Sequence, residues 1–243
     1  METRLFKKRN GIIPACDVNN IQKLGTLVEE TYDIDGVVGY KIGSILTLKY
    51  GLRKIVDRIR AITDFPIVYD HQKGGTDIPE ISSGAFLNIC KEAEVNAIII
   101  FPLSGIKTLR MIVANCKEIG LIPIVGGEMT HKGYLSSEGG YLSVDAPERI
   151  YKDAGSLGVK HFVIPGTKIK SIEKYSSLLA KTVHNPEFLF PGVGKGQGGD
   201  IISAFKATQL YASYAIVGRG IYAEKDMKGA ARNLLKNIGG QID

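Results

Sequence analysis

Short apolar runs alternate with longer amphipathic segments along almost the whole chain. Runs of this length are typical of buried strands, and the segments between them place apolar residues three and four apart, as helices do. We expect eight strands, at residues 12–17, 36–42, 66–70, 97–101, 122–127, 160–165, 187–192 and 214–218. Helical segments between them include residues 21–32, 45–62, 106–120 and 146–158.

Eight alternating strand and helix units predict an α/β fold with a single-domain (β/α)8 barrel over residues 1–243. An open doubly wound sheet is the structural alternative. The connections are short, and no low-complexity linker divides the chain. In a barrel of this kind the chemistry lies at the carboxyl ends of the strands, so polar residues there are the first functional candidates.

Four of the expected strands end in residues able to do chemistry. Asp17 follows the first strand, Lys41 lies near the end of the second, and Asp70 ends the third. The fifth strand is followed by Glu128, Thr130 and His131. Because parallel strands of a barrel end at one rim, we expect these side chains to face a common mouth.

Composition narrows the class of ligand. The net charge is +6, which suits an anionic partner, but the lysines are spread along the chain without an arginine-rich block or an RNA-binding aromatic motif. We therefore expect a small anionic ligand and no nucleic acid. Three separated cysteines without metal-ligand spacing, no signal peptide and no membrane-spanning run predict a cytoplasmic protein with reduced core thiols and no membrane contact.

Two glycine-rich segments near the end of the chain predict a phosphate site. Residues 191–200 read PGVGKGQGGD and follow the seventh strand, and residues 216–222 read IVGRGIY around the end of the eighth. Loops after these two strands frequently bind phosphate in (β/α)8 enzymes, because glycine lets several backbone N–H groups approach one anion. The expected ligands are Gly194, Gln197, Gly198, Gly218 and Arg219. Ordinary turn glycines are the alternative.

The third strand ends in YDHQKGGTDI, residues 69–78, which carries charges of alternating sign. Asp70, Lys73 and Asp77, together with Lys41, could hold one another ionised inside a site. A lysine between carboxylates has a raised pKa, so it is a poor Schiff-base nucleophile and a well-placed proton donor. A surface ion-pair cluster of little energetic value is the alternative.

These segments resemble, in order, those of the orotidine 5′-phosphate decarboxylase family, whose members are (β/α)8 enzymes of pyrimidine biosynthesis. The matching segments are PACDV, GYKIG, YDHQKGGTDIP, GGEMTH, PGVGKGQGGD and VGRGIY. The resemblance covers nearly the whole chain. It implies decarboxylation of orotidine 5′-monophosphate to uridine 5′-monophosphate, with no metal or organic cofactor.

The resemblance also implies roles at the scissile end of the substrate. Asp17 and Lys41 would hold the ribose hydroxyls, and Asp70 would lie near the substrate carboxylate. Lys73 would stabilise and protonate the C6 carbanion. Asp77 would come from the neighbouring subunit of a homodimer and contact Lys73 and a ribose hydroxyl.

At the other end of the substrate, Thr130 would bind the pyrimidine, and Gln197 and Arg219 the phosphate. His131 stands where the family has a histidine and would brace its loop. The glycine loop carries one residue more than the family pattern, which leaves Gln197 as its expected phosphate ligand.

The third-strand motif departs from the family spacing. Two residues rather than one separate Asp70 from Lys73, and three rather than two separate Lys73 from Asp77. Residues three apart on a regular strand face opposite sides, so a bulge or turn is expected, and glycines 74 and 75 permit one. The added His71 is interpreted as a hydrogen-bonded structural residue, or else as a new participant in the site.

Two other functions remain open on the sequence. One is a magnesium-dependent sugar-phosphate lyase or decarboxylase of the same superfamily, which uses an enediolate. The other is a non-catalytic nucleotide-phosphate binding protein in which the altered spacing has displaced Lys73.

Overall fold

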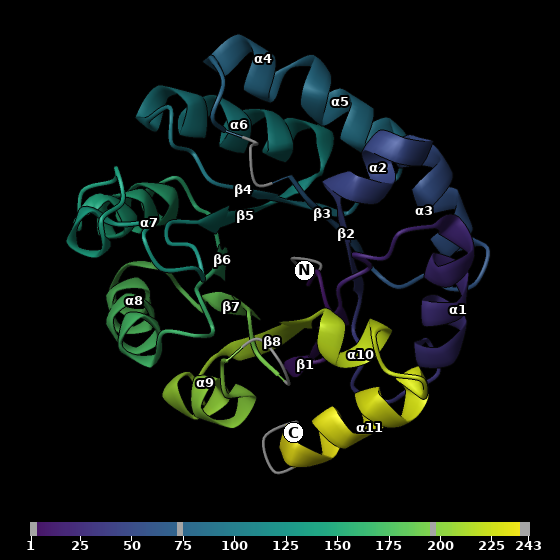
Figure 1. The fold of residues 1–243 in the computed structure, drawn as a ribbon. Coiled ribbons are helices and arrows are strands. Elements are labelled where there is room, and N and C mark those ends of the chain that lie inside the picture. Colours follow the sequence, from purple (N-terminus) through teal and green to yellow (C-terminus); the bar gives the residue numbers. More distant parts are fainter. Residues whose placement is uncertain (1–3, 72–74, 195–197, 239–243) are drawn as a thin grey trace.

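The eight expected strands all form, and they make one parallel barrel surrounded by helices (Figure 1). The computed structural model describes residues 4–71, 75–194 and 198–238. The sheet order is β1-β8-β7-β6-β5-β4-β3-β2. The strands are β1 (Asn10–Pro14), β2 (Tyr40–Gly43), β3 (Ile67–Asp70), β4 (Ala97–Ile100), β5 (Ile122–Gly126), β6 (His161–Val163), β7 (Glu187–Pro191) and β8 (Ala212–Val217).

Bridges between β1 and β2 close the barrel. The Ile12 N–H donates to the Gly36 carbonyl at 2.8 Å, and the Cys16 N–H donates to the Lys41 carbonyl at 2.7 Å. A Cβ on Gly11 would lie 2.5 Å from the Gly36 oxygen, so glycine is required for this close approach. The barrel prediction is confirmed, and the open sheet is wrong. The second strand is shorter than expected, because residues 36–39 reach β1 only through an isolated bridge.

Helices follow the strands and cover the outside of the barrel (Figure 1). Three expected helices form nearly as predicted, but the segment at 45–62 is two helices, because Gly51 adopts φ +84° between them. The α-helices are α1 (Ile21–Thr31), α2 (Ser44–Tyr50), α3 (Leu52–Arg60), α4 (Pro79–Ser83), α5 (Ala85–Glu92), α6 (Ile106–Ile119), α7 (Ala146–Ser156), α8 (Ile169–Thr182), α9 (Ile201–Ala207), α10 (Arg219–Tyr222) and α11 (Met227–Ile238). A 3₁₀ turn, η1 (Ser136–Glu138), lies between β5 and α7.

Strand alternation divides the core into two buried clusters. One cluster collects alternate strand residues together with the N-terminal segment, where the rings of Phe6 and Tyr214 lie 4.4 Å apart. The other joins the opposite strand faces to the helices. All three cysteines are buried and free, as expected of core thiols. Over the described ranges, no helix has the length and apolar character needed to cross a membrane.

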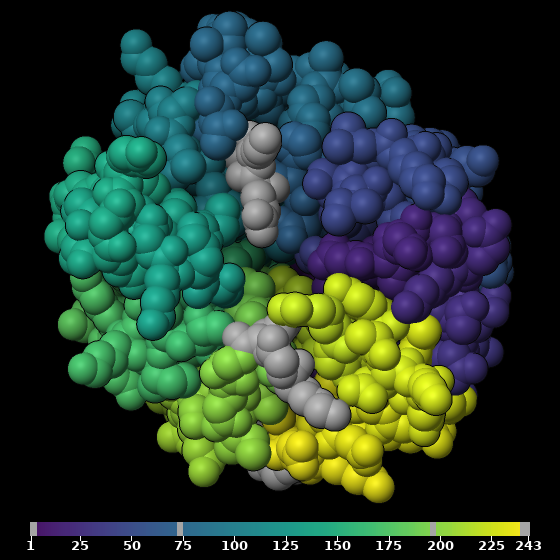
Figure 2. Space-filling model, viewed as in Figure 1, coloured from purple at the N-terminus to yellow at the C-terminus, as the bar shows by residue number. Residues whose placement is uncertain are grey.

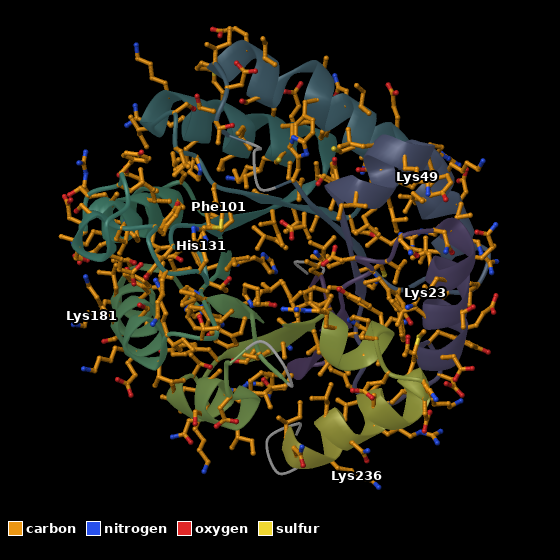
Figure 3. All side chains as sticks on the ribbon, in the orientation of Figure 1. Lys23, Lys49, Phe101, His131, Lys181 and Lys236 are labelled. Carbon is orange, nitrogen blue, oxygen red and sulfur yellow. The ribbon has the colours of Figure 1, made fainter. Side chains whose placement is uncertain are left out.

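The loops after the strands form one face of the molecule, which is hollowed near its centre (Figure 2). In the stick view, the labelled Phe101 and His131 lie toward the middle of this face, whereas Lys23, Lys49, Lys181 and Lys236 lie at its edge (Figure 3). Phe101 lies against Gly126, where a Cβ would be 2.3 Å from the ring. A bulkier residue at 126 would therefore push this ring aside.

Candidate active site

A lysine held between two carboxylates lies at the mouth of the barrel. Lys41 Nζ donates to both carboxylate oxygens of Asp17 at 2.9 Å and to Oδ2 of Asp70 at 3.2 Å. Lys41 lies in β2 and Asp70 ends β3, and Asp17 lies just beyond β1; the register brings Gly43 beside Asp70 and Ala15 beside Lys41. Three of the expected strand-end residues are therefore brought together.

Burial makes this arrangement more than a surface ion pair. The side chain of Lys41 is 7% exposed and that of Asp70 is 13% exposed. Burial alone lowers the pKa of Lys41, but the charges of Asp70 and Asp17 outweigh it, so the pKa is raised and the ammonium stays protonated. Burial raises the pKa of Asp70, and the charge of Lys41 only partly opposes that shift. The surface-cluster alternative does not apply to these residues.

Asp70 stands between two cavities. The larger has a volume of about 540 Å³ and is lined by Asp17, Lys41, Asp70 and His71 together with residues of α2. The smaller is about 40 Å³ and is lined by Asp70, Glu128, Thr130 and apolar groups from β4, β6, β7 and β8. Asp70 Oδ1 is buried and has no hydrogen-bond partner among the described residues. A buried acceptor without a donor is costly, which is typical of an atom that acts on a ligand.

The rest of the third-strand motif is only partly described. Lys73 lies outside the described residues. Asp77 is exposed on the rim, where its carboxylate accepts from the N–H of Ile78 at 2.7 Å, and no described contact joins it to Lys41 or Asp70. The register of β3 is regular through Asp70, so the two added residues fall beyond the strand rather than in a bulge within it. Gly75 turns the chain there with φ +87°.

His71 packs toward the helices. Its Nδ1 lies 3.0 Å from the Tyr69 hydroxyl, and its ring centroid lies 4.7 Å from that of Phe86 on α5. This hydrogen bond is the one that the structural interpretation expects. The same ring also lines the larger cavity.

The two glycine loops are adjacent, because β7 and β8 are paired strands. The stem of the first loop is closed by two bonds: the Gly194 N–H donates to the Gly199 carbonyl at 3.0 Å, and the Gly199 N–H to the Gly192 carbonyl at 3.1 Å. Gly194 and Gly198 have φ of +99° and +86°, which glycine adopts readily. Gln197 lies outside the described residues. Gly218 is buried at the end of β8, and Arg219 begins α10 with its side chain exposed.

Thr130 lines the smaller cavity together with Asp70, and it packs on the first glycine loop. A Cβ on Gly192 would lie 3.0 Å from the methyl group of Thr130. The Thr130 carbonyl accepts from the Thr167 hydroxyl at 3.1 Å. Next to Thr167, Lys168 forms ion pairs that the sequence patterns did not single out, because its partners come from a different loop.

Among the residues the structure describes, no group of three or more histidine, cysteine, aspartate or glutamate side chains is placed to hold a metal ion. Among the described residues, the charges on the β1–β3 side of the mouth are the two carboxylates and one ammonium of Asp17, Asp70 and Lys41, and Arg219 follows the adjacent strand β8.

A family model, the orotidine 5′-phosphate decarboxylase / HUMPS family, matches residues 11–234. The chain belongs to this family. The family predicted from the ordered motifs is thereby confirmed.

Individual family members match over almost their full length. An orotidine 5′-phosphate decarboxylase from Methanosphaera stadtmanae is 28% identical over 95% of this chain and 98% of the relative. One from Pyrococcus abyssi is 29% identical over 95% of this chain and 100% of the relative.

Solved structures share the fold. The orotidine 5′-monophosphate decarboxylase from Methanocaldococcus jannaschii, complexed with the inhibitor BMP, superimposes with a TM-score of 0.76 at 22% identity and covers 93% of this chain and 97% of that chain. The enzyme from Pyrococcus horikoshii gives 0.76 at 23%, covering 94% and 99%.

Proposed function

We propose that this protein decarboxylates orotidine 5′-monophosphate to uridine 5′-monophosphate without a metal or organic cofactor. The observation that carries the proposal is the Lys41 ammonium, buried between Asp17 and Asp70 at a mouth that also bears two glycine loops. Relatives named for this activity match the chain from end to end. The charged groups and the phosphate loops are the parts that such a reaction needs.

Loss of carbon dioxide breaks the bond between C6 and the carboxylate carbon, and the electron pair stays on C6. A localised carbanion of this kind needs a fixed cation beside it and then a proton. Lys73 is the proposed source of both. Asp70, whose ionised form burial makes costly, would lie beside the substrate carboxylate and favour its departure.

The remaining groups bind the rest of the nucleotide. Asp17 and Lys41 would hold the ribose hydroxyls, Thr130 the pyrimidine, and Arg219 the phosphate with Gln197 and the glycines at 194, 198 and 218. An arginine gives a bidentate charge-assisted contact to phosphate oxygens. Binding energy from this remote group can then be used at the reacting carbon.

The activity is tested with the wild-type protein and EDTA. We expect orotidine 5′-monophosphate to be converted to uridine 5′-monophosphate and carbon dioxide at the same rate with and without the chelator. A protein that makes no uridine 5′-monophosphate and instead needs magnesium to act on a sugar phosphate belongs to the other branch. Tight binding of uridine 5′-monophosphate without turnover would mark a binding protein instead.

The active form is proposed to be a cytoplasmic homodimer in which Asp77 reaches the partner's site. Exposed apolar side chains occupy one sector of the rim, beside the larger cavity: Ile45 and Leu48 on α2, and Ile78 and Ile81 around the start of α4. Leu48 is 86% exposed, and α2 and α4 follow the paired strands β2 and β3. A clustered apolar rim is typical of an interface.

Leu48→Glu is expected to dissociate the dimer, because it places a charge in the apolar contact. Sedimentation should show a monomer at assay concentration, with kcat/KM reduced at least about tenfold because Asp77 no longer reaches the site. Leu210→Glu, an equally apolar residue 74% exposed after α9, is the control and should leave both unchanged. A fully active wild-type monomer would reject the shared site.

A further inference from the structure

A second ion-pair cluster, buried at one end and exposed at the other, lies on the β5–β6 side of the mouth. Lys168 Nζ donates to Oε1 of Glu128 at 2.8 Å and to the two carboxylate oxygens of Glu138 at 2.9 and 3.1 Å. We call these three residues the Lys168 bridge. No role proposed above uses it.

The bridge closes the loop that carries Thr130. Glu128 lies two residues beyond the end of β5, Glu138 lies in η1, and Thr130 falls between them. Lys168 comes from the other side, at the N-cap of α8 after β6. The neighbouring Thr167 hydroxyl donates to the Thr130 carbonyl at 3.1 Å. Residues 128–138 are therefore held at both ends and near Thr130 by two consecutive residues of the next loop.

Burial distinguishes this bridge from the ion pairs on the surface. The Glu128 side chain is 3% exposed and that of Lys168 is 17% exposed. Surface pairs hold little energy, but removing one partner of a buried pair leaves an uncompensated charge. Burial alone lowers the pKa of Lys168, and the hydrogen bonds to the two glutamates outweigh it, so the pKa is raised and the ammonium stays charged.

Glu128 Oε2, the carboxylate oxygen not bonded to Lys168, is buried and has no hydrogen-bond partner among the described residues. The same is true of the hydroxyl of Tyr134 in the same loop. The charge of Glu128 contributes to raising the pKa of Tyr134 to about 12, although burial is the larger cause. Among the described residues, Lys168 is the cation paired with Glu128, so its removal leaves this buried carboxylate uncompensated.

We propose that Lys168 is a positioning residue for the pyrimidine: by bridging Glu128 and Glu138 it fixes the loop that presents Thr130 to the base. The proposal rests on the proposed function, in which Thr130 binds the pyrimidine. Lys168 itself does not touch the substrate. Its loss should therefore weaken the binding of ligands that carry the base and leave unchanged the binding of ligands that carry only the sugar phosphate.

The test compares two ligands in Lys168→Met. We expect the affinity for uridine 5′-monophosphate to fall about tenfold, because loosened positioning groups typically cost this much or more, and the affinity for ribose 5-phosphate to stay within about twofold. KM for orotidine 5′-monophosphate should rise by a similar factor, with kcat at saturation within about threefold of the wild type. Lys168→Arg should restore the affinity for uridine 5′-monophosphate and KM for orotidine 5′-monophosphate.

Two further variants make the test specific. Lys174→Met removes an exposed ion pair of the same helix, the 3.2 Å contact between Lys174 and Glu148, which involves no residue of the 128–138 loop and should change nothing. Glu128→Gln combined with Lys168→Met avoids an uncompensated buried charge and should fold well while keeping the weakened affinity for uridine 5′-monophosphate.

Hydrogen exchange of residues 128–138, measured without ligand, should quicken in Lys168→Met and not in Lys174→Met. Unchanged exchange would overturn the bridge as a restraint on the loop. Two results would overturn its role toward the base. One is faster exchange in Lys168→Met with wild-type affinity for uridine 5′-monophosphate. The other is an equal loss of affinity for uridine 5′-monophosphate and ribose 5-phosphate. A wild type that does not turn over orotidine 5′-monophosphate would instead overturn the proposed function.

Discussion

Lys73→Ala is expected to lower kcat for orotidine 5′-monophosphate by at least about 1,000-fold, because in the proposed mechanism Lys73 is both the cation beside the C6 carbanion and the proton donor. Affinity for uridine 5′-monophosphate should change little, since the base, ribose and phosphate are held by other groups. Single-turnover kinetics at saturating substrate separate the two effects. Added primary amines, which can enter the vacated space, should recover part of the lost rate.

The matched control is Lys49→Ala. Lys49 is an exposed lysine at the edge of the same face, where it donates to the Asn19 carbonyl at 3.2 Å. Its removal should leave kcat unchanged. Turnover by Lys73→Ala within tenfold of the wild type would reject Lys73 as the donor while leaving the activity itself in place.

Lys41→Met should lower the free energy of unfolding by about 3 kcal/mol, because it leaves two carboxylates, one of them buried, without their shared ammonium. It should also raise the pKa of Asp70 further, since the charge of Lys41 is the largest effect that opposes burial there. We therefore expect kcat/KM to fall at least about 100-fold at neutral pH. Urea unfolding and steady-state kinetics measure the two quantities.

The sign of the pH dependence follows from the raised pKa of Lys41. Stability from this ammonium is fully present below its unfolded pKa of about 10.4 and is lost as the pH rises through the higher folded value. The wild type should therefore lose stability above about pH 10.4 in a way that Lys41→Met does not.

Lys228→Met is the control for the stability measurement. It removes a partly exposed pair with Asp33 and should cost much less stability than Lys41→Met. Equal destabilisation in the two variants would show that the Lys41 network has no special energetic role.

Local pattern was sufficient for much of the site. Asp17, Lys41 and Asp70 each follow or end an apolar run, and the rule that barrel strands end at one rim was enough to predict that they meet. The glycines at 194 and 198 could be predicted as phosphate ligands because glycine-rich loops after the seventh strand of such barrels frequently bind phosphate. Asp77 was placed on the rim, but its proposed partner belongs to another chain, so no pattern within one chain can test it.

The Lys168 bridge shows what local pattern misses. Lys168 follows no motif, and its partners lie 30 and 40 residues away in the preceding loop. Ion pairs across that separation depend on how two loops emerge from neighbouring strands and on which side chains are buried there. Gly51 is a milder case, because its positive φ divides a segment whose apolar spacing is continuous.

The order of apolar runs by itself determined the number of strands, the barrel and the rim on which the polar residues lie. The spacing of apolar residues and the length of each run are local properties of the chain. The family followed from the ordered motifs. Only the tertiary structure decided that Lys41 is buried between two carboxylates, that Asp70 Oδ1 is buried with no hydrogen-bond partner among the described residues, and that Lys168 pairs with Glu128 and Glu138. Burial and distance across strands set these electrostatic properties, and neither is encoded in any single segment.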